Sequence, residues 1–277
     1  MSGEGADPGG DGVRLTEYAE LHGCSCKVGQ SDLADLLADA GLRDGAGDRR
    51  APRDVLAGVG EDAAARRLTE DLALVQTIDY FTPIVDDPYD FGRVAACNAC
   101  SDAFATGAVD DVSFLVVLGL PRDLTGHAAA VLAGVQDVLD AVDEAVVGGH
   151  TTLNPWPLAG GAGTATAAPA DRLYSSGAAP GDRLLLTKPL GTQPAMGASR
   201  VSDGEFAAAV AGATNRAIDD IATAAVDWMT TPNAAAARAA RGVATAATDV
   251  TGFGLHGQAG VLAERSGVGV ELTALPV

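Results

Sequence analysis

The chain has 277 residues, of which 47% are hydrophobic, so it is long enough for two ordinary domains that each bury a core. Its formal net charge of −19 argues against nucleic acid and anionic membrane surfaces as partners, because both would be repelled. No apolar run reaches the roughly 18 residues of a membrane span, and the acidic N-terminus lacks a secretion signal, which predicts a cytoplasmic protein. Lysine is scarce among the 18 basic residues, which fits either a salt-rich cytoplasm or a GC-rich genome.

The predicted elements of the first half begin with an arm and continue as alternating strands and helices. Residues 1–13 are predicted to be a disordered tail, and residues 14–50 a mobile arm that includes a short helix at 30–41. Strands are predicted at 71–81, 113–121, 145–150 and 159–168, and helices at 91–108 and 124–145. The helix at 91–108 has small residues throughout, which predicts that it packs tightly.

A second unit is predicted from residue 173. An APGD turn leads into an apolar strand, LLLT, and residues 205–229 are predicted to be helical. Residues 247–267 read as a loop and then a helix that a glycine ends. The chain stops inside an alternating strand pattern, VGVELTALPV, which predicts an incomplete domain. The order of elements indicates an α+β protein with an N-terminal domain at 51–172 and a C-terminal domain at 173–277.

Four aspartates stand where predicted strands or loops end, beside small or apolar residues: Asp62, Asp79, Asp102 and Asp249. A carboxylate is costly to bury in such surroundings unless it is paired or bound to a metal. Oxygen ligands suit Mg²⁺, which usually takes substrate phosphate oxygens as well. Capping or turn formation remains open for each acid taken singly. Together the four acids indicate a magnesium and phosphate site.

Glycine-rich loops accompany these acids at 58–60, 148–149 and 252–254. Backbone amides in such loops can hold phosphate oxygens. The chain has no G-x-x-x-x-G-K-[ST] sequence, which excludes a P-loop enzyme.

The four cysteines allow two interpretations. In the first, Cys24, Cys26, Cys97 and Cys100 form a zinc site, although C-x-C is a poor zinc spacing. In the second, Cys97 and Cys100 are small buried helix residues, and Cys24 is a reactive thiol whose thiolate form Lys27 would favour. Lys27 could equally reach a phosphate as a point charge.

Seven stretches of the chain, in order from residue 14, resemble the selenophosphate synthetases (selenide, water dikinases) of the aminoimidazole-ribonucleotide-synthetase-like ATP-binding superfamily. They are RLTEYAELHGCSCKV, VGEDAA, TIDYFTPIVDDPYDFGRVAACNACSDAFATG, VVGGHTT, LLLTKPLG, ATDVTGFGLHG and LTALP. The C-x-C-K motif separates this family from its purine-synthesis and hydrogenase-maturation relatives. The resemblance implies a two-domain PurM-like fold and a homodimer in which N-terminal strands of both chains build one β-barrel.

The resemblance also implies a reaction and its residues. ATP, selenide and water would give selenophosphate, AMP and phosphate. Cys24 and Lys27 would be catalytic, and Asp62, Asp102 and Asp249 would bind Mg²⁺. The implied nucleotide contacts are Lys27, Val59, Gly60, Glu61, Asp79, Asn98, Asp102, Gly149, His150 and Thr151. The arm around Cys24 would close over the nucleotide as a lid.

The chain departs from the family pattern in two places. His22 and Ser25 replace more flexible residues of the arm, which predicts a stiffer lid. Pro155, Trp156 and Pro157 replace a P-E-P element that carries an acid. The missing acid and the early stop leave open a truncated, inactive ATP-binding or regulatory homologue. A superfamily relative acting on another acceptor is a second alternative, against which Cys24 and Lys27 argue.

Overall fold

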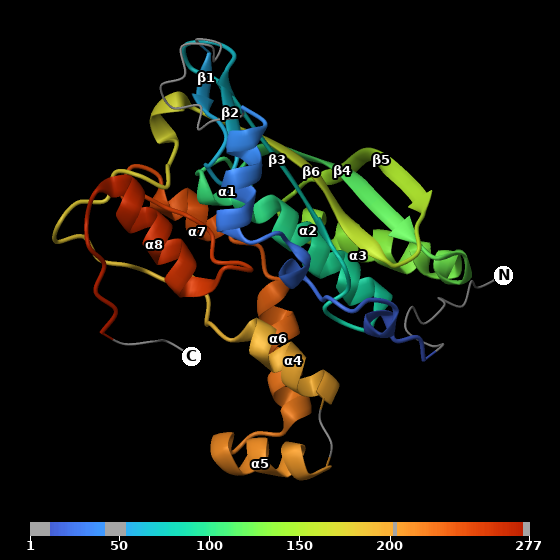
Figure 1. The fold of residues 1–277 in the computed structure, drawn as a ribbon. Coiled ribbons are helices and arrows are strands. Elements are labelled where there is room, and N and C mark those ends of the chain that lie inside the picture. Colours follow the sequence, from blue (N-terminus) through green and yellow to red (C-terminus); the bar gives the residue numbers. More distant parts are fainter. Residues whose placement is uncertain (1–11, 42–53, 202–203, 274–277) are drawn as a thin grey trace.

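A six-stranded sheet forms the N-terminal part of the molecule (Figure 1). The computed structural model describes residues 12–41, 54–201 and 204–273, so nearly all of the predicted tail lies outside the described residues. The strands, in sheet order, are β1 (Val55–Ala57), β2 (Ala64–Arg67), β3 (Ala73–Phe81), β6 (Leu158–Ala167), β4 (Asp110–Leu120) and β5 (Ala145–Leu153). Neighbouring strands are antiparallel, except that β4 and β5 run parallel. The four predicted strands are confirmed as β3, β4, β5 and β6.

Two helices, α2 (Pro88–Ala105) and α3 (Ala128–Asp140), lie against one face of the sheet (Figure 1). They approach each other at glycines. A Cβ atom on Gly92 of α2 would lie 1.9 Å from the carbonyl oxygen of Val131 in α3, and Gly134 of α3 approaches α2 equally closely. The small residues of α2 therefore allow the tight packing that the sequence predicts.

The alternation of β3 divides its side chains between the two faces of the sheet. Thr77 and Asp79 point to the helix side and are buried, whereas Ile78 and Tyr80 on the other side are 63% and 49% exposed. Leu115 of β4 is 47% exposed and is paired with the same β6 residue as Ile78. We call the surface around Ile78, Tyr80 and Leu115 the open face; it is apolar and no helix of the described chain covers it.

The described elements beyond residue 173 are helical. They are α4 (Thr192–Val201), α5 (Gly204–Thr214), α6 (Ile218–Met229), α7 (Ala234–Ala240) and α8 (Gly254–Ser266). Helices α4, α5 and α6 extend away from the sheet. Helices α7 and α8 lie closer to it, on the side of the sheet that carries β1 and β2 (Figure 1). The predicted glycine stop is confirmed as Gly267, which adopts a left-handed conformation after α8. Among the helices of the described residues, none is long and apolar enough to cross a membrane.

The prediction of two strands in the second unit is wrong for this structure. Residues 182–187, which include LLLT, are irregular, as are residues 268–273. Leu185 is 90% exposed. An isolated strand is not stable without a partner and a covering layer, and neither stretch has either within the described part of the chain.

Candidate active site

The N-terminal arm lies across the end of β3. Gly23 forms an isolated bridge with Thr82, and its N–H donates to the Thr82 carbonyl at 2.9 Å. Gly23 has a φ of 57°, and a Cβ atom there would lie 3.1 Å from the side chain of Ile84. The following residues make a single 3-10 turn, η2 (Cys24–Cys26). A glycine is thus needed at position 23 to bring the turn against the sheet.

A chain of polar contacts joins this turn to β3 and α2. The Nζ atom of Lys27 lies 2.6 Å from Oδ2 of Asp79. The Asn98 amide donates to the same oxygen at 2.5 Å, and the Cys24 thiol donates to Oδ1 of Asn98 at 3.5 Å. The structure therefore brings together four residues that the sequence selected from three separate segments.

Burial controls the protonation of the two arm side chains. Burial raises the pKa of Cys24 to about 12, and the nearby charge of Lys27 only partly offsets this. Burial is the largest influence on Lys27 and would lower its pKa, but the charge and hydrogen bond of Asp79, together with Cys24 and Asp102, outweigh burial and the pKa is raised. In this arrangement Lys27 is charged and Cys24 is a thiol. The expected activation of Cys24 as a thiolate does not occur here, because desolvation outweighs the neighbouring cation.

The side chains of Asp102 and Asp249 contact each other near this chain of polar contacts. Asp102 accepts a hydrogen bond from Oγ1 of Thr77 at 2.6 Å, and Asp249 contacts both Ser101 and Asp102. Burial, followed by the charge of Asp249, raises the pKa of Asp102 well above its usual range, and burial also raises the pKa of Asp249. The buried Oδ2 atom of Asp249 has no hydrogen-bond partner. Such an orphaned carboxylate oxygen is available to a cation.

Asp62 is the third acid of this group. Its Oδ1 accepts a hydrogen bond from Oγ1 of Thr248 at 3.0 Å. Burial, followed by the charge of Asp249, raises the pKa of Asp62 to about 7. Within the described ranges, no three histidine, cysteine or acidic side chains already form a metal-binding group. A cation shared by these acids would therefore take further oxygens from a bound phosphate.

The loop that carries Asp249 also covers the arm. A Cβ atom on Gly252 would lie 2.7 Å from the Cβ atom of Cys24. Only glycine therefore lets the second unit approach Cys24 so closely. One loop of that unit thus supplies both an acid and the cover over Cys24.

Sequence reasoning missed two residues that support the site, namely Thr77 and Thr248, and it assigned Gly252 to a phosphate loop without its contact to Cys24. Thr77 lies two residues before Asp79, and a strand places such residues on one face, so the period of β3 could have identified it. Thr248 and Gly252 stand in the ATDVTGFG stretch, but their partners come from distant segments. No local pattern indicates those partners.

The predicted nucleotide contact Glu61 is engaged by the second unit. Its carboxylate accepts hydrogen bonds from the backbone N–H and the hydroxyl of Ser175, at 3.1 and 2.8 Å. Arg265 of α8 lies 2.6 Å from the same carboxylate and also donates to the Gly60 carbonyl at 2.6 Å. Glu61 therefore fastens the two units together in this structure, while its neighbour Val59 is 38% exposed.

The predicted contacts at residues 149–151 lie on β5, at the edge of the sheet. Asp79 of β3 pairs with Gly161 of β6, Gly161 with Val116 of β4, and Val116 with Gly149 of β5. Gly149 and Asp79 therefore lie in one row that runs across the sheet. Three strand spacings, about 14 Å, separate the two residues. The structure does not bring this segment to the acids within one chain.

The cysteines do not support the zinc interpretation. All four are free, and none of them belongs to a metal-binding group in the described part of the chain. Cys97 and Cys100 are 5% and 2% exposed in α2. Burial raises the pKa of both thiols, that of Cys100 to about 12. They serve as small core residues.

Family models and curated relatives match both units of the chain. Residues 60–167 match the model of the AIR synthase related protein, N-terminal domain, and residues 179–277 match the C-terminal domain of the same description. A selenide, water dikinase of Methanocaldococcus jannaschii is 40% identical over 97% of this chain and 77% of its own length. Selenide, water dikinase 3 of Danio rerio is 34% identical over 92% of this chain and 63% of its own length.

Solved structures share the fold. A ThiL protein complexed with AMPPCP and TMP has a TM-score of 0.64 at 20% identity, covering 86% of this chain and 71% of its own. A thiamine-monophosphate kinase from Stenotrophomonas maltophilia has a TM-score of 0.58 at 26% identity, covering 85% and 71%. The predicted two-domain α+β fold is confirmed.

Proposed function

The chain belongs to the selenide, water dikinase family, and we propose that its docked arm and acid cluster turn ATP, selenide and water into selenophosphate, AMP and phosphate. The observation that carries the proposal is the contact of the C-x-C-K turn with the acids: Lys27 binds Asp79, and the charge of Asp102 acts on Lys27. Phosphoryl transfer depends on positioning and charge neutralisation more than on covalent chemistry. This site offers both.

Lys27 is proposed to move from Asp79 to a phosphate oxygen when ATP binds. The Lys27 side chain is 31% exposed, so a ligand can approach it, and its raised pKa keeps it charged. A triphosphate carries more negative charge than one carboxylate and competes well for a point charge. Asn98, which now donates to Asp79, would help to orient the same phosphates.

Mg²⁺ is the proposed cofactor, held by Asp62, Asp102 and Asp249. Their raised pKa values show that the three carboxylates are costly to ionise together without a cation, and the orphaned oxygen of Asp249 fits a ligand role. Thr77 and Thr248 orient two of the acids. Bound Mg²⁺ would neutralise the triphosphate during transfer.

Cys24 is proposed to place the selenide without bonding to it. An S–Se bond between a thiol and selenide would require the removal of two electrons, and neither ATP nor water accepts them. As a buried thiol next to Lys27, Cys24 can instead hydrogen-bond to a hydroselenide anion whose charge the lysine balances. The arm of residues 14–50 would act as a lid that admits the substrates.

A homodimer is the proposed assembly, in the cytoplasm. A second copy would cover the open face in a shared β-barrel, and we propose that it also supplies its own residues 149–151 to the acids, because within one chain this segment lies about 14 Å from Asp79. The proposed domains are residues 51–172 and 173–277. The family-model matches at 60–167 and 179–277 support that division.

The test is selenide-dependent formation of AMP from ATP and Mg²⁺. The wild-type chain should form AMP only with selenide, Cys24→Ala should form none because it lacks the hydrogen-bond donor, and the matched variant Cys26→Ala should retain activity. ADP formation without selenide would favour a superfamily relative acting on another acceptor. ATP binding without turnover would favour an inactive homologue.

A further inference from the structure

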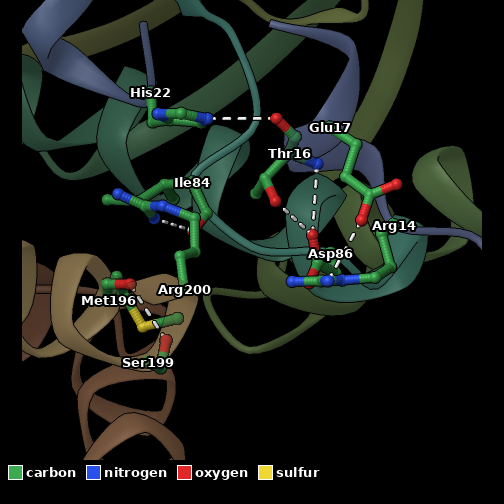
Figure 2. A network of polar contacts seen from close by, with 9 residues as sticks. All are labelled: Arg14, Thr16, Glu17, His22, Ile84, Asp86, Met196, Ser199 and Arg200. Atoms are coloured by element: carbon green, nitrogen blue, oxygen red, sulfur yellow. Dashed lines mark hydrogen bonds and ion pairs between the residues drawn. The ribbon is translucent and has the colours of Figure 1, made fainter. Parts of the chain in front are cut away.

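The root of the N-terminal arm is fastened to one carboxylate, that of Asp86 (Figure 2). Asp86 lies in the loop between β3 and α2. Its side chain accepts hydrogen bonds from Nε of Arg14 at 3.0 Å, from the backbone N–H of Thr16 at 3.2 Å and from the Thr16 hydroxyl. We propose that Asp86 is a positioning residue that holds the arm docked, so that Cys24 and Lys27 reach the acid cluster. This inference rests on the proposed function.

The arm is firmly attached at this root. Leu15 and Thr16 are 0% and 5% exposed, and the Leu15 N–H donates to the Asp86 carbonyl at 3.2 Å. Burial would raise the pKa of Asp86, but the hydrogen bonds from Thr16 and Arg14 outweigh it and the pKa is lowered. Asp86 is therefore ionised, and its bonds to the arm are charge-assisted, which roughly doubles the strength of such bonds.

Hydrogen bonds continue from the root to the tip of the arm. Nε2 of His22 lies 3.0 Å from the Thr16 carbonyl oxygen (Figure 2), and the Thr82 hydroxyl donates to the Leu21 carbonyl. The Ser25 hydroxyl donates to the His22 carbonyl at 2.5 Å and accepts from the His22 N–H at 3.1 Å. A shift of Thr16 away from Asp86 would thus be passed to the turn that contains Cys24. The two arm residues that depart from the family pattern, His22 and Ser25, are both part of this connection.

The loop that carries Asp86 is held independently of the arm. Arg200 of α4 donates to the Ile84 carbonyl at 3.0 Å (Figure 2), and Asp87 caps α2 by accepting from the Asp90 N–H at 2.8 Å. The loop therefore stays in place if the arm leaves. Asp86 acts as a fixed anchor, and the arm is the part that moves.

The experiment measures how fast iodoacetamide alkylates Cys24, with each modified cysteine identified by peptide mass spectrometry. A docked Cys24 reacts slowly because its pKa is about 12, whereas a released thiol returns toward its ordinary range. Asp86→Ala should raise the rate about ten-fold, as expected for losing several charge-assisted hydrogen bonds. Asp86→Asn should raise it less, because its side-chain carbonyl still accepts from Thr16.

Two controls separate release of the arm from general unfolding. Cys97 and Cys100 are buried in α2 and should remain unmodified in every folded variant. Asp86 and Asp90 both line a cavity of about 280 Å³. Asp90→Ala removes a carboxylate that pairs with Arg93 on its own helix rather than with the described residues of the arm. It should leave the alkylation rate of Cys24 unchanged.

In the AMP assay, Asp86→Ala should raise the KM for ATP about ten-fold with a smaller effect on kcat, because the arm must first be placed again. Unchanged alkylation of Cys24 in folded Asp86→Ala would overturn the proposal, whatever the activity. If Cys24 is alkylated faster in Asp86→Ala but the wild-type chain makes no AMP, the result would support the anchor and reject the proposed reaction. If Asp86→Ala also exposes Cys97, then Arg14→Ala and Thr16→Val decide, and no acceleration in either variant would overturn the proposal.

Discussion

The ion pair between Lys27 and Asp79 is partly buried, mainly on the side of Asp79. The two side chains are 31% and 8% exposed. Removing one member of a buried pair leaves an uncompensated charge, so Lys27→Met should lower the free energy of unfolding by about 3 kcal/mol and abolish AMP formation. Urea denaturation measures the first effect. Arg66→Met is the control, because its pair with Asp54 is 59% and 35% exposed and should contribute under about 1 kcal/mol. Equal losses in the two variants would contradict the prediction.

The raised pKa of Asp62 makes the stability of the metal-free protein depend on pH. Its pKa is about 7 when folded and 3.8 when unfolded, so the folded state binds the proton more tightly. The contribution of Asp62 to the free energy of unfolding therefore falls as pH rises from about 4 to about 7. Above about pH 7, the carboxylate is ionised and its full destabilising effect is present. With EDTA, the Tm of the wild type should drop between pH 5 and 7.5 by more than that of Asp62→Asn.

Magnesium should reverse this loss, because the ionised form of Asp62 is the one that binds a cation. The rise in Tm on adding Mg²⁺ and ATP should be larger at pH 7.5 than at pH 5, and smaller in Asp62→Asn. A rise that is the same at both pH values would show that Asp62 is not a ligand.

At the scale of elements, the contact between α2 and α3 depends on glycine. Gly92→Ala would place a Cβ atom 1.9 Å from a carbonyl oxygen of α3, so the helices must separate. We expect a loss of about 3 kcal/mol in the free energy of unfolding, the upper end for overpacking. Gly212→Ala is the matched control, since a Cβ atom there meets nothing within 4 Å and the helical propensity of α5 should gain about 0.5–1 kcal/mol. Opposite signs in thermal denaturation are the expected result.

Elements that are determined by their own residues could be predicted from local pattern. The two-residue period of β3 and the small residues of α2 each determine a buried face, and both were located within a few residues. The left-handed glycine after α8 was found in the same way. Local pattern singles out Cys24, Lys27 and Asp79, the family resemblance adds Asn98, and the fold brings the four residues together.

Elements and contacts that depend on distant segments could not be predicted in this way. LLLT has the composition of a strand, but composition does not supply a neighbouring strand. The position of residues 149–151 follows from the order β3, β6, β4, β5, which no local pattern contains. The thiol form of Cys24 depends on burial beneath Gly252, a residue more than two hundred positions away in the chain.

At the scale of the whole molecule, the open face predicts how two copies associate. Ile78 and Leu115 are 63% and 47% exposed at the centre of the sheet, and exposed apolar surface of this kind marks an interface. Ile78→Asp and Leu115→Asp should convert the proposed dimer to a monomer in sedimentation velocity and abolish AMP formation. Leu185→Asp, at a leucine that is 90% exposed outside the sheet, should leave the dimer intact.

Mixing two inactive variants tests whether the site is shared between the copies. Cys24→Ala lacks the hydrogen-bond donor, and Thr151→Glu places a negative charge where the partner's segment would meet the triphosphate. In a mixed dimer one site would combine the intact Cys24 of one chain with the intact Thr151 of the other, so random exchange should restore about a quarter of wild-type activity. No recovery in a mixture shown to contain mixed dimers would mean that residues 149–151 act within their own chain or not at all. The arrangement of β5 at the edge of the sheet argues for recovery, because within one chain about 14 Å separates it from Asp79.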